Sequence, residues 1–365
     1  MRGIIILLLT LCLSACARTD YDPGQTAAGL EKVPFSVEVR QNQFVTVCDI
    51  FHSRILGYIW HWNDSGSFAL MDQMFIWNME KQELEKKIAM NQEYLFSAVL
   101  DGDGGIYVGC ADVEDCEGER WSLLYCGTRE NKFAGLKDGT SSLLAGWGSP
   151  WLAHVGNNIV GVYEERNESG KTGIGCIAVD GGNIRKLTEI KWDENVKYLS
   201  GKVAASEEKF AYLVEKEDGS FLRVVNPGNG EVLEFPWKKK GYDFAIAGEQ
   251  LLQSGQGEQE GQYVLHRYDL GTGAEESDRV KGPGFRMTPV GENAILSVDS
   301  FFNVCYTRIG NGGIEESYMD LPENLKERSV RFLTDEKGQV FFVYEDMPQG
   351  EAAAEIYRCR MQTEK

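Results

Sequence analysis

Short apolar runs alternate with polar residues over most of the chain, and tight polar turns separate these runs. The stretch from Ala98 to Leu136 shows the plan most clearly: strand, Gly/Asp turn, strand, acidic loop, strand, polar turn, strand. Alternation rich in β-branched and aromatic residues predicts strands, and Asn, Asp and Gly accept the left-handed backbone that hairpins need. We therefore expect repeated units of four antiparallel strands.

Two turn signals recur along the chain. A polar turn entering an apolar strand, assigned to the innermost hairpin of each unit, occurs at residues 41–43, 101–105, 156–158, 207–209, 248–249, 291–293 and 335–338. An outer hairpin is most distinct at residues 268–276, with weaker copies at 75–88, 125–136, 176–187, 224–235 and 305–318. A leading outer strand without its partner follows at Glu355–Arg360. Repeats of about 40–60 residues are typical of propeller blades.

These counts predict an all-β fold, a seven-bladed β-propeller over residues 34–361. Six or eight blades, or a pair of β-sandwiches, are the alternatives, and the regular spacing favours the propeller. Pro34–Val39 is an apolar strand with no partner nearby, and the last unit lacks its outermost strand. We expect this N-terminal strand to complete the last blade, because a closed ring leaves no free sheet edge.

The turns also carry a family resemblance. Asp269 to Gly273, with its Thr-Gly pair, looks like a turn of many propeller blades, whereas the Gly-His and Trp-Asp signatures of WD40 repeats are missing. The chain resembles the divergent propellers grouped with NHL, PQQ-type and two-component-regulator repeats. This resemblance implies an architecture alone, since one fold serves many functions.

The N-terminus has the pattern of a secretory signal. One basic residue precedes an apolar run from Ile4 to Leu13, which is shorter than the about 20 residues that a membrane-spanning helix needs. The sequence LSAC that ends at Cys16 resembles the lipobox of bacterial lipoproteins. That resemblance implies removal of residues 1–15, lipid attachment at Cys16, and a tether over residues 16–33. We expect an extracytoplasmic protein held at the cell surface or in the periplasm by its lipid.

Charge and cysteine content limit the partners. The net charge of -19 argues against nucleic acid, whose phosphates are bound by Lys and Arg. Seven cysteines follow Cys16 at irregular spacing, and several lie in apolar strand patterns where a thiol acts as a small buried apolar group. Cys110 and Cys116 flank one loop and are a possible disulfide in an oxidising compartment.

Searches for catalytic and metal motifs give no site. The chain lacks HExxH, GxSxG and CxxC, and the Asp101–Gly105 run lacks the glycine of a calcium loop, so a tight turn explains it. His52 and His61 share the first unit without an acidic partner at an identifiable spacing. We therefore expect no catalytic residue, no metal ligand and no cofactor.

Propeller topology predicts a binding face. The loop between the second and third strands of a blade opens on the same face as the crossover to the next blade. The first of these loops is the most acidic, with Asp112, Glu114, Asp115 and Glu117, and later ones are also acidic. The crossovers carry aromatic residues: Trp147, Trp151, Trp192, Trp237 and Phe285. Aromatic rings among carboxylates suit sugar rings or cationic peptides.

The sequence thus favours a membrane-anchored propeller that acts as a non-enzymatic binding module for a protein, peptide or glycan. Two alternatives stay open. One is a polysaccharide-active enzyme, a glycosidase or lyase, that uses rim carboxylates as acid and base. The other is a sensor or accessory subunit of an envelope complex.

Overall fold

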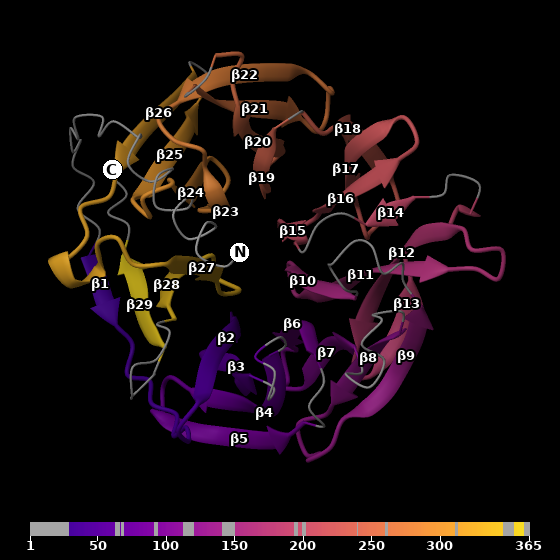
Figure 1. Ribbon diagram of the computed structural model, residues 1–365, viewed down its shortest axis with the longest axis vertical. Helices are drawn as coiled ribbons and strands as arrows, with labels where there is room; N and C mark the ends of the chain where they lie inside the picture. Colours follow the sequence, from indigo (N-terminus) through magenta and orange to yellow (C-terminus); the bar gives the residue numbers. More distant parts are fainter. Residues whose placement is uncertain are drawn as a thin grey trace, which may run out of the picture.

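The computed structural model describes residues 29–62, 66, 69–90, 94–111, 120–140, 150–192, 196–198, 202–238, 240–259, 262–310, 313–345 and 354–360. Seven antiparallel sheets stand around a central axis in this part of the chain (Figure 1). The predicted seven-bladed β-propeller is confirmed. A short 3₁₀ helix, η3 (Glu323–Leu325), lies in the last crossover. Among the described residues, no helix has the length and hydropathy of a membrane span.

Blades 1 to 3 each have four strands, which follow one another from the axis outward. Blade 1 comprises β2 (Gln43–Phe51), β3 (Arg54–Trp62), β4 (Ala69–Asn78) and β5 (Glu83–Ala89). Blade 2 comprises β6 (Tyr94–Leu100), β7 (Ile106–Ala111), β8 (Arg120–Cys126) and β9 (Ala134–Thr140). Blade 3 comprises β10 (Trp151–Val155), β11 (Asn158–Arg166), β12 (Thr172–Asp180) and β13 (Asn183–Lys186).

Blade 4 differs, because two short strands share the inner edge of its sheet. It comprises β14 (Lys197–Tyr198) and β15 (Ala204–Ala205), both paired with β16 (Phe210–Lys216), then β17 (Gly219–Val225) and β18 (Val232–Pro236). Blade 5 comprises β19 (Gly241–Ala247), β20 (Gln250–Gln256), β21 (Tyr263–Asp269) and β22 (Glu275–Val280). Blade 6 comprises β23 (Phe285–Pro289), β24 (Ala294–Val298), β25 (Val304–Gly310) and β26 (Gly313–Tyr318).

Blade 7 joins the two ends of the domain. Its inner strands are β27 (Val330–Thr334), β28 (Val340–Tyr344) and β29 (Glu355–Arg360), and its outermost strand is β1 (Gly29–Lys32). β1 runs antiparallel to β29, with Gly29 opposite Arg360 and Lys32 opposite Tyr357. The ring is therefore closed by an N-terminal strand, as predicted.

The residues that close the ring differ from those predicted. Pro34–Val39 is not a strand; it belongs to the crossover from the outside of blade 7 to β2. Its apolar residues pack into the junction of blades 7 and 1, where Phe35 lies 5.7 Å from the ring of Trp77, whose Nε1 donates to the carbonyl of Pro34. The alternation of apolar and polar residues in this segment thus comes from packing and not from a strand. The strand that closes the ring, β1, lies within residues 16–33, which were expected to form a tether.

The first inner turn was also predicted at the wrong place. Residues 41 and 42 precede β2, which begins at Gln43, and the inner hairpin of blade 1 turns at His52 and Ser53. Both residues have a left-handed backbone, with φ of 47° and 58°. This matches a two-residue hairpin turn without its usual Asn or Gly, so the sequence pattern carried no signal for it. The other six inner turns lie between the first two strands of blades 2 to 7.

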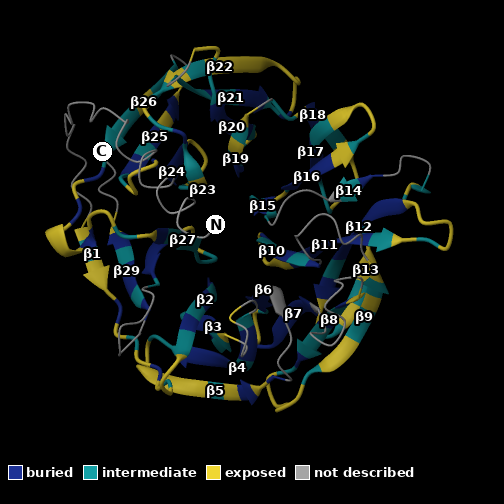
Figure 2. Ribbon diagram, in the orientation of Figure 1, coloured by how far each residue is buried: buried dark blue, intermediate teal, exposed yellow. Residues whose placement is uncertain are grey.

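Buried apolar residues lie between the blades rather than under a single sheet. The described interior contains seven clusters, and each lies between two neighbouring blades. A strand close to the axis is covered on both faces, which is why β24 and β28 are buried at every position. Figure 2 shows the outermost strands, such as β5 and β22, as the exposed edge of the ring.

Polar side chains tie the inner strands of successive blades together. Each accepts a backbone N–H from the next blade at 2.7–2.8 Å: Asp49 from Leu100, Ser97 from Leu152, Asp243 from Met287, and Glu345 from Val47. An inner strand has no ladder partner on its axial side, so these N–H groups need another acceptor. These contacts link blade 1 to blade 2, blade 2 to blade 3, blade 5 to blade 6 and blade 7 to blade 1.

The two faces of the propeller differ in what they carry. The innermost hairpins and the outer hairpins open on one face, here called the hairpin face. The loops between second and third strands and the crossovers between blades open on the other, the crossover face. The crossover aromatics that the structure describes, Trp151, Trp192, Trp237 and Phe285, therefore belong to the crossover face.

Candidate functional site

The predicted rim residues divide into those the structure describes and those it does not. Asp112, Glu114, Asp115, Glu117 and Trp147 lie outside the described residues, as do Cys16 and Cys116. Cys110 is buried at the end of β7, and its possible disulfide with Cys116 is not tested. The remaining four aromatic residues occupy four different parts of the ring.

Three of these aromatics pack largely between blades. Trp151 lies against the cluster between blades 3 and 4, and Trp237 against the one between blades 4 and 5. Trp237 also meets Phe244 edge-on at 6.0 Å. Phe285 packs between blades 6 and 7 and touches Tyr242, with ring centroids 5.1 Å apart. Trp151 and Trp237 therefore contribute mainly to the core.

Trp192 lines a groove of about 450 Å³ between blades 2 and 3, here called the Trp192 groove. Its lining includes Lys137 from β9 and Ile184 and Lys186 from β13. These are the outermost strands of blades 2 and 3 (Figure 1). Its apolar lining is Trp192, the ring of Tyr163 from β11, and Ile177, Ile184 and Ile190. A groove of this volume is in the range of small-ligand sites.

Two glycines of β12 create the space for these rings. A Cβ on Gly173 would lie 2.4 Å from Cγ2 of Ile190 and 3.3 Å from Cε3 of Trp192. A Cβ on Gly175 would lie 2.3 Å from Cζ of Tyr163. Glycine inside a strand often marks such a close approach. The Thr-Gly-Ile-Gly sequence of β12 therefore shapes the groove from below.

Charged side chains of both signs border the groove. Nζ of Lys137, on β9, lies 3.7 Å from Oε2 of Glu165 and 4.8 Å from the ring centroid of Tyr163. Lys186 forms an ion pair with Glu189 on the other side. Two lysines and two glutamates leave the lining neutral as a set. A neutral, polar ligand suits this border better than a polyanion.

The Tyr163 hydroxyl is a hydrogen-bond donor over the whole physiological pH range. Burial raises its pKa to about 12, and the nearby Glu165, Cys176 and Glu189 add to the shift. Within the part of the chain that the structure describes, no acceptor is hydrogen-bonded to this hydroxyl. The groove thus offers a flat indole, an aliphatic floor, a neutral O–H donor and four charged groups.

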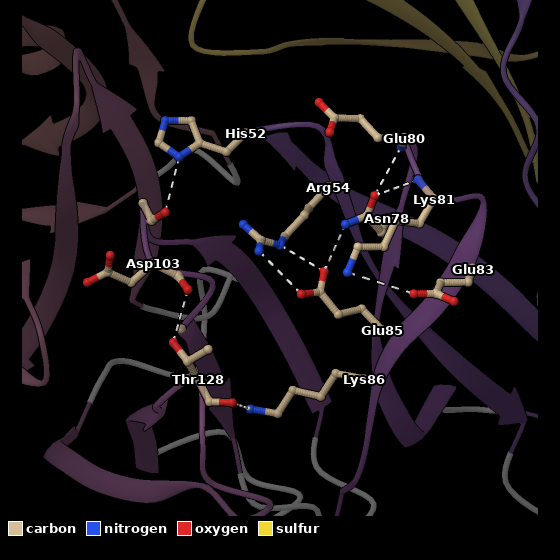
Figure 3. Close-up of polar contacts among 12 residues, drawn as sticks. His52, Arg54, Asn78, Glu80, Lys81, Glu83, Glu85, Lys86, Asp103 and Thr128 are labelled. Carbon is tan, nitrogen blue, oxygen red and sulfur yellow. Dashed lines mark hydrogen bonds and ion pairs between the residues drawn. The ribbon is translucent and has the colours of Figure 1, made fainter.

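The histidines do not form a joint site. His52 and His61 lie at opposite ends of β3, about 25–30 Å apart at strand spacing. Nδ1 of His52 lies 3.1 Å from the carbonyl oxygen of Gly102 on the hairpin face, beside the Arg54–Glu85 ion pair (Figure 3). His61 lies near the crossover face, with Nδ1 3.0 Å from a carboxylate oxygen of Asp72. The sequence spacing did not reveal Asp72 as its acidic partner.

His154 also has a carboxylate partner. Its Nε2 lies 2.9 Å from Oδ2 of Asp49, and its ring stacks on Phe51 at 4.2 Å. Among the described residues, no three His, Cys, Asp or Glu side chains gather in a way that would hold a metal ion. His52 and His154 therefore contact other blades, whereas His61 and His266 contact residues of their own blades.

Most of the Trp192 groove was missed by sequence reasoning. Lys137, Tyr163 and Glu189 come from separate elements, and of the lining only Trp192 and Glu165, in one of the acidic loops, had been singled out. The glycines at 173 and 175 were the available signal, because two glycines two apart in an apolar strand imply close neighbours on one face.

Comparisons with known proteins support the fold. No protein-family model matches the chain, and no curated protein matches it either. Among solved structures it is similar to the polysaccharide lyase Uly1, with 9% identity, 94% of each chain covered and a TM-score of 0.56. An oligogalacturonate lyase in complex with manganese has 9% identity, covers 92% of this chain and 97% of its own, and has a TM-score of 0.52.

A third similar structure is the β-propeller domain of the Trilobed protease from Pyrococcus furiosus. It has 11% identity, covers 90% of this chain and 97% of its own, and gives a TM-score of 0.51. At such identities the likeness extends to the propeller fold and not to an activity.

Proposed function

We propose that this chain is a lipid-anchored, extracytoplasmic propeller that binds a glycan in the Trp192 groove. The observation that carries the proposal is the pairing of a Trp192 wall and a Tyr163 hydroxyl with two Lys–Glu pairs in one groove. The apolar face of a sugar ring stacks on an aromatic ring, while its hydroxyls bond to charged and hydroxyl groups around it. The neutral lining favours a glycan without high charge.

A glycan array on the full chain in detergent, followed by titration of the best binder, tests this site. Trp192→Ala is expected to weaken binding by about tenfold or more, the effect of losing roughly 1.4 kcal/mol of contact. Trp62→Ala is the matched control, because Trp62 is 42% exposed on another blade. Equal affinity of Trp192→Ala and wild type, or equal loss in both variants, would contradict the assignment. If the protein binds a peptide and no glycan, the proposal that the ligand is a glycan is wrong.

Glycan cleavage is a second candidate function, because two carboxylates, Glu165 and Glu189, line the same groove. Each contacts a lysine ammonium, which suits a binding role. Incubation of the bound glycan with the protein should return it intact. Cleavage that disappears in both Glu165→Gln and Glu189→Gln would favour a paired-carboxylate enzyme instead.

The anchor is tested separately from the groove. Cys16→Ala in the full chain should release the protein from the membrane fraction, because no lipid can then be attached. Cys12→Ala, four residues earlier in the same apolar segment, should stay membrane-bound. Retention of the Cys16→Ala protein on membranes would refute lipid anchoring at this residue.

A further inference from the structure

Four five-residue turns of the propeller share one hydrogen-bond scheme. In each, the side-chain Oδ1 of the first residue accepts the backbone N–H groups two and four positions later, at 2.6–3.1 Å. The turns begin at Asp101, Asn167, Asp299 and Asp335. The scheme requires a left-handed backbone at the fourth residue of the turn.

Phe302 is exceptional among the residues at this fourth position. The other three turns have Gly104, Gly170 and Gly338 there, with φ of 89°, 81° and 71°, whereas Phe302 has φ of 61°. A bulky side chain in this region costs free energy that glycine does not. Since the same turn folds with glycine, the fold does not need Phe302.

The side chains at this turn point to solvent rather than into the core. Phe302 is 38% exposed and its neighbour Phe301 is 50% exposed. The turn connects β24 to β25, so both rings lie on the crossover face. Asp299 holds the loop firmly, through the two N–H groups above and the side-chain amide of Asn303 at 2.9 Å. The exposed rings are therefore presented by an ordered loop.

Arg286 lies beside Phe302 and also has a strained backbone conformation. Its backbone is also left-handed, with φ of 55°, at an irregularity in the pairing of β23 with β24. Its guanidinium carbon lies 5.9 Å from the Phe302 ring centroid, and Nη1 donates to Ser329 Oγ at 3.0 Å and to the carbonyl of Val330. Among the described residues no carboxylate pairs with Arg286, which leaves Nε and Nη2 for a ligand.

The charge around Arg286 is locally positive in a strongly acidic chain. Arg331 is near enough, together with burial, to lower the pKa of Arg286, whereas Glu345 opposes that shift. Glu345 is already bound to Nη2 of Arg331 at 2.6 Å and to the N–H of Val47. Glu345 thus pairs with Arg331 and not with Arg286. One carboxylate from a bound partner would neutralise the remaining positive charge of Arg286.

The aromatic surface continues beyond Arg286. The side chain of Tyr242, 36% exposed at the start of β19, meets Phe285 with ring centroids 5.1 Å apart. Tyr242, Arg286, Phe301 and Phe302 are here called the docking patch. Exposed aromatics with an arginine, held on ordered backbone, have the composition of the residues that dominate protein interfaces.

We propose that the docking patch binds a partner protein through an apolar segment that carries one carboxylate. The carboxylate pairs with Nε and Nη2 of Arg286 in the two-bond geometry that guanidinium groups favour. The apolar side chains of the segment cover Phe301 and Phe302, which have no polar atom to offer the hydroxyls of a sugar. This site is distinct from the Trp192 groove and does not depend on it.

A phage-displayed library of random linear peptides, selected on the full chain in detergent, tests the proposal. Enriched peptides are expected to place one Asp or Glu among apolar residues. A synthetic peptide of the enriched sequence should lose at least about tenfold in affinity for Arg286→Gln and for Phe302→Gly, as hot-spot residues do. Its Asp→Asn or Glu→Gln counterpart should lose a similar factor on the wild-type protein.

The controls separate docking from folding. Phe302→Gly introduces the residue that the other three turns have at this position. Its melting temperature should therefore equal or exceed that of the wild type, while peptide binding is lost. Arg279→Gln removes an exposed arginine from the outer strand β22 and should leave peptide binding unchanged. Enriched peptides without a carboxylate, or peptides that bind Phe302→Gly as tightly as wild type, would overturn the proposal.

Discussion

Gly173→Ala tests whether the lack of a side chain at residue 173 is what allows Ile190 and Trp192 to form the floor of the Trp192 groove. The new Cβ would lie 2.4 Å from Cγ2 of Ile190. Favourable carbon–carbon contact begins at about 3.5 Å, so Ile190 must retreat by about 1.1 Å. Trp192 follows two residues later and its ring is itself 3.3 Å from the new atom. We expect the free energy of unfolding to fall by about 1–3 kcal/mol and glycan affinity to fall with it.

Gly135→Ala is the matched control for this substitution. It lies in β9, facing open space, since a Cβ there meets nothing within 4 Å. Alanine should leave stability unchanged or raise it by about 0.4–1 kcal/mol, because it restricts the unfolded chain. Urea unfolding followed by tryptophan fluorescence gives the two midpoints, and a titration gives the two affinities. Equal midpoints would refute the steric argument, and full affinity in a destabilised Gly173→Ala protein would refute the groove as the site.

Three further predictions concern the ring itself. Asp243→Ala removes the carboxylate that pairs with Lys202, which keeps the Met287 carbonyl as an acceptor, and leaves the inner-strand N–H of blade 6 without its acceptor. Urea unfolding should therefore show a loss of about 2–4 kcal/mol, and Asp243→Asn a smaller one. Val33→Pro removes an N–H that bonds to β29 at 2.8 Å and should lower the melting temperature, consistent with about 1–3 kcal/mol. Burial lowers the pKa of His154, but the charge and hydrogen bond of Asp49 outweigh it and the net shift is upward. Its stabilising effect is present below the unfolded pKa and lost as pH rises through the folded one, so His154→Gln should cost more at roughly pH 5.5 than at roughly pH 8; an equal cost at both would contradict this.

The repeat architecture was predictable because turn chemistry is local. Six inner turns contain Gly, Asn, Asp or a similar polar pair, and five of them have a glycine with positive φ, at 104, 156, 248, 291 and 338. The seventh turn uses His52 and Ser53, whose conformation comes from the strands around them. The alternation at Pro34–Val39 misled for a related reason, because a crossover that packs into the core shows the same pattern as a strand.

The strand that closes the ring had no readable signal. β1 has the sequence Gly-Leu-Glu-Lys and is largely exposed, so neither alternation nor apolar content marked it. The Trp192 groove was hidden for another reason, since its walls come from blades 2 and 3 and their approach depends on tertiary packing. The strain at Phe302 could have been predicted from the sequence. Two other turns have the pattern Asp-x-x-Gly, and the turn that begins at Asp299 has phenylalanine at the position of the glycine.

The direction of β1 determines how the propeller bears mechanical load. β1 enters at Gly29 on the hairpin face and runs toward the crossover face, paired with β29 along its length. If the proposed lipid tether pulls on Gly29 from the hairpin face while a partner on the crossover face holds the rest of the ring, the tension acts between β1 and β29. The force then runs along the strand axis and acts in shear, so that the ladder hydrogen bonds resist together instead of opening one after another. The seam of the ring is thus oriented to resist the tension that the proposed tether would exert.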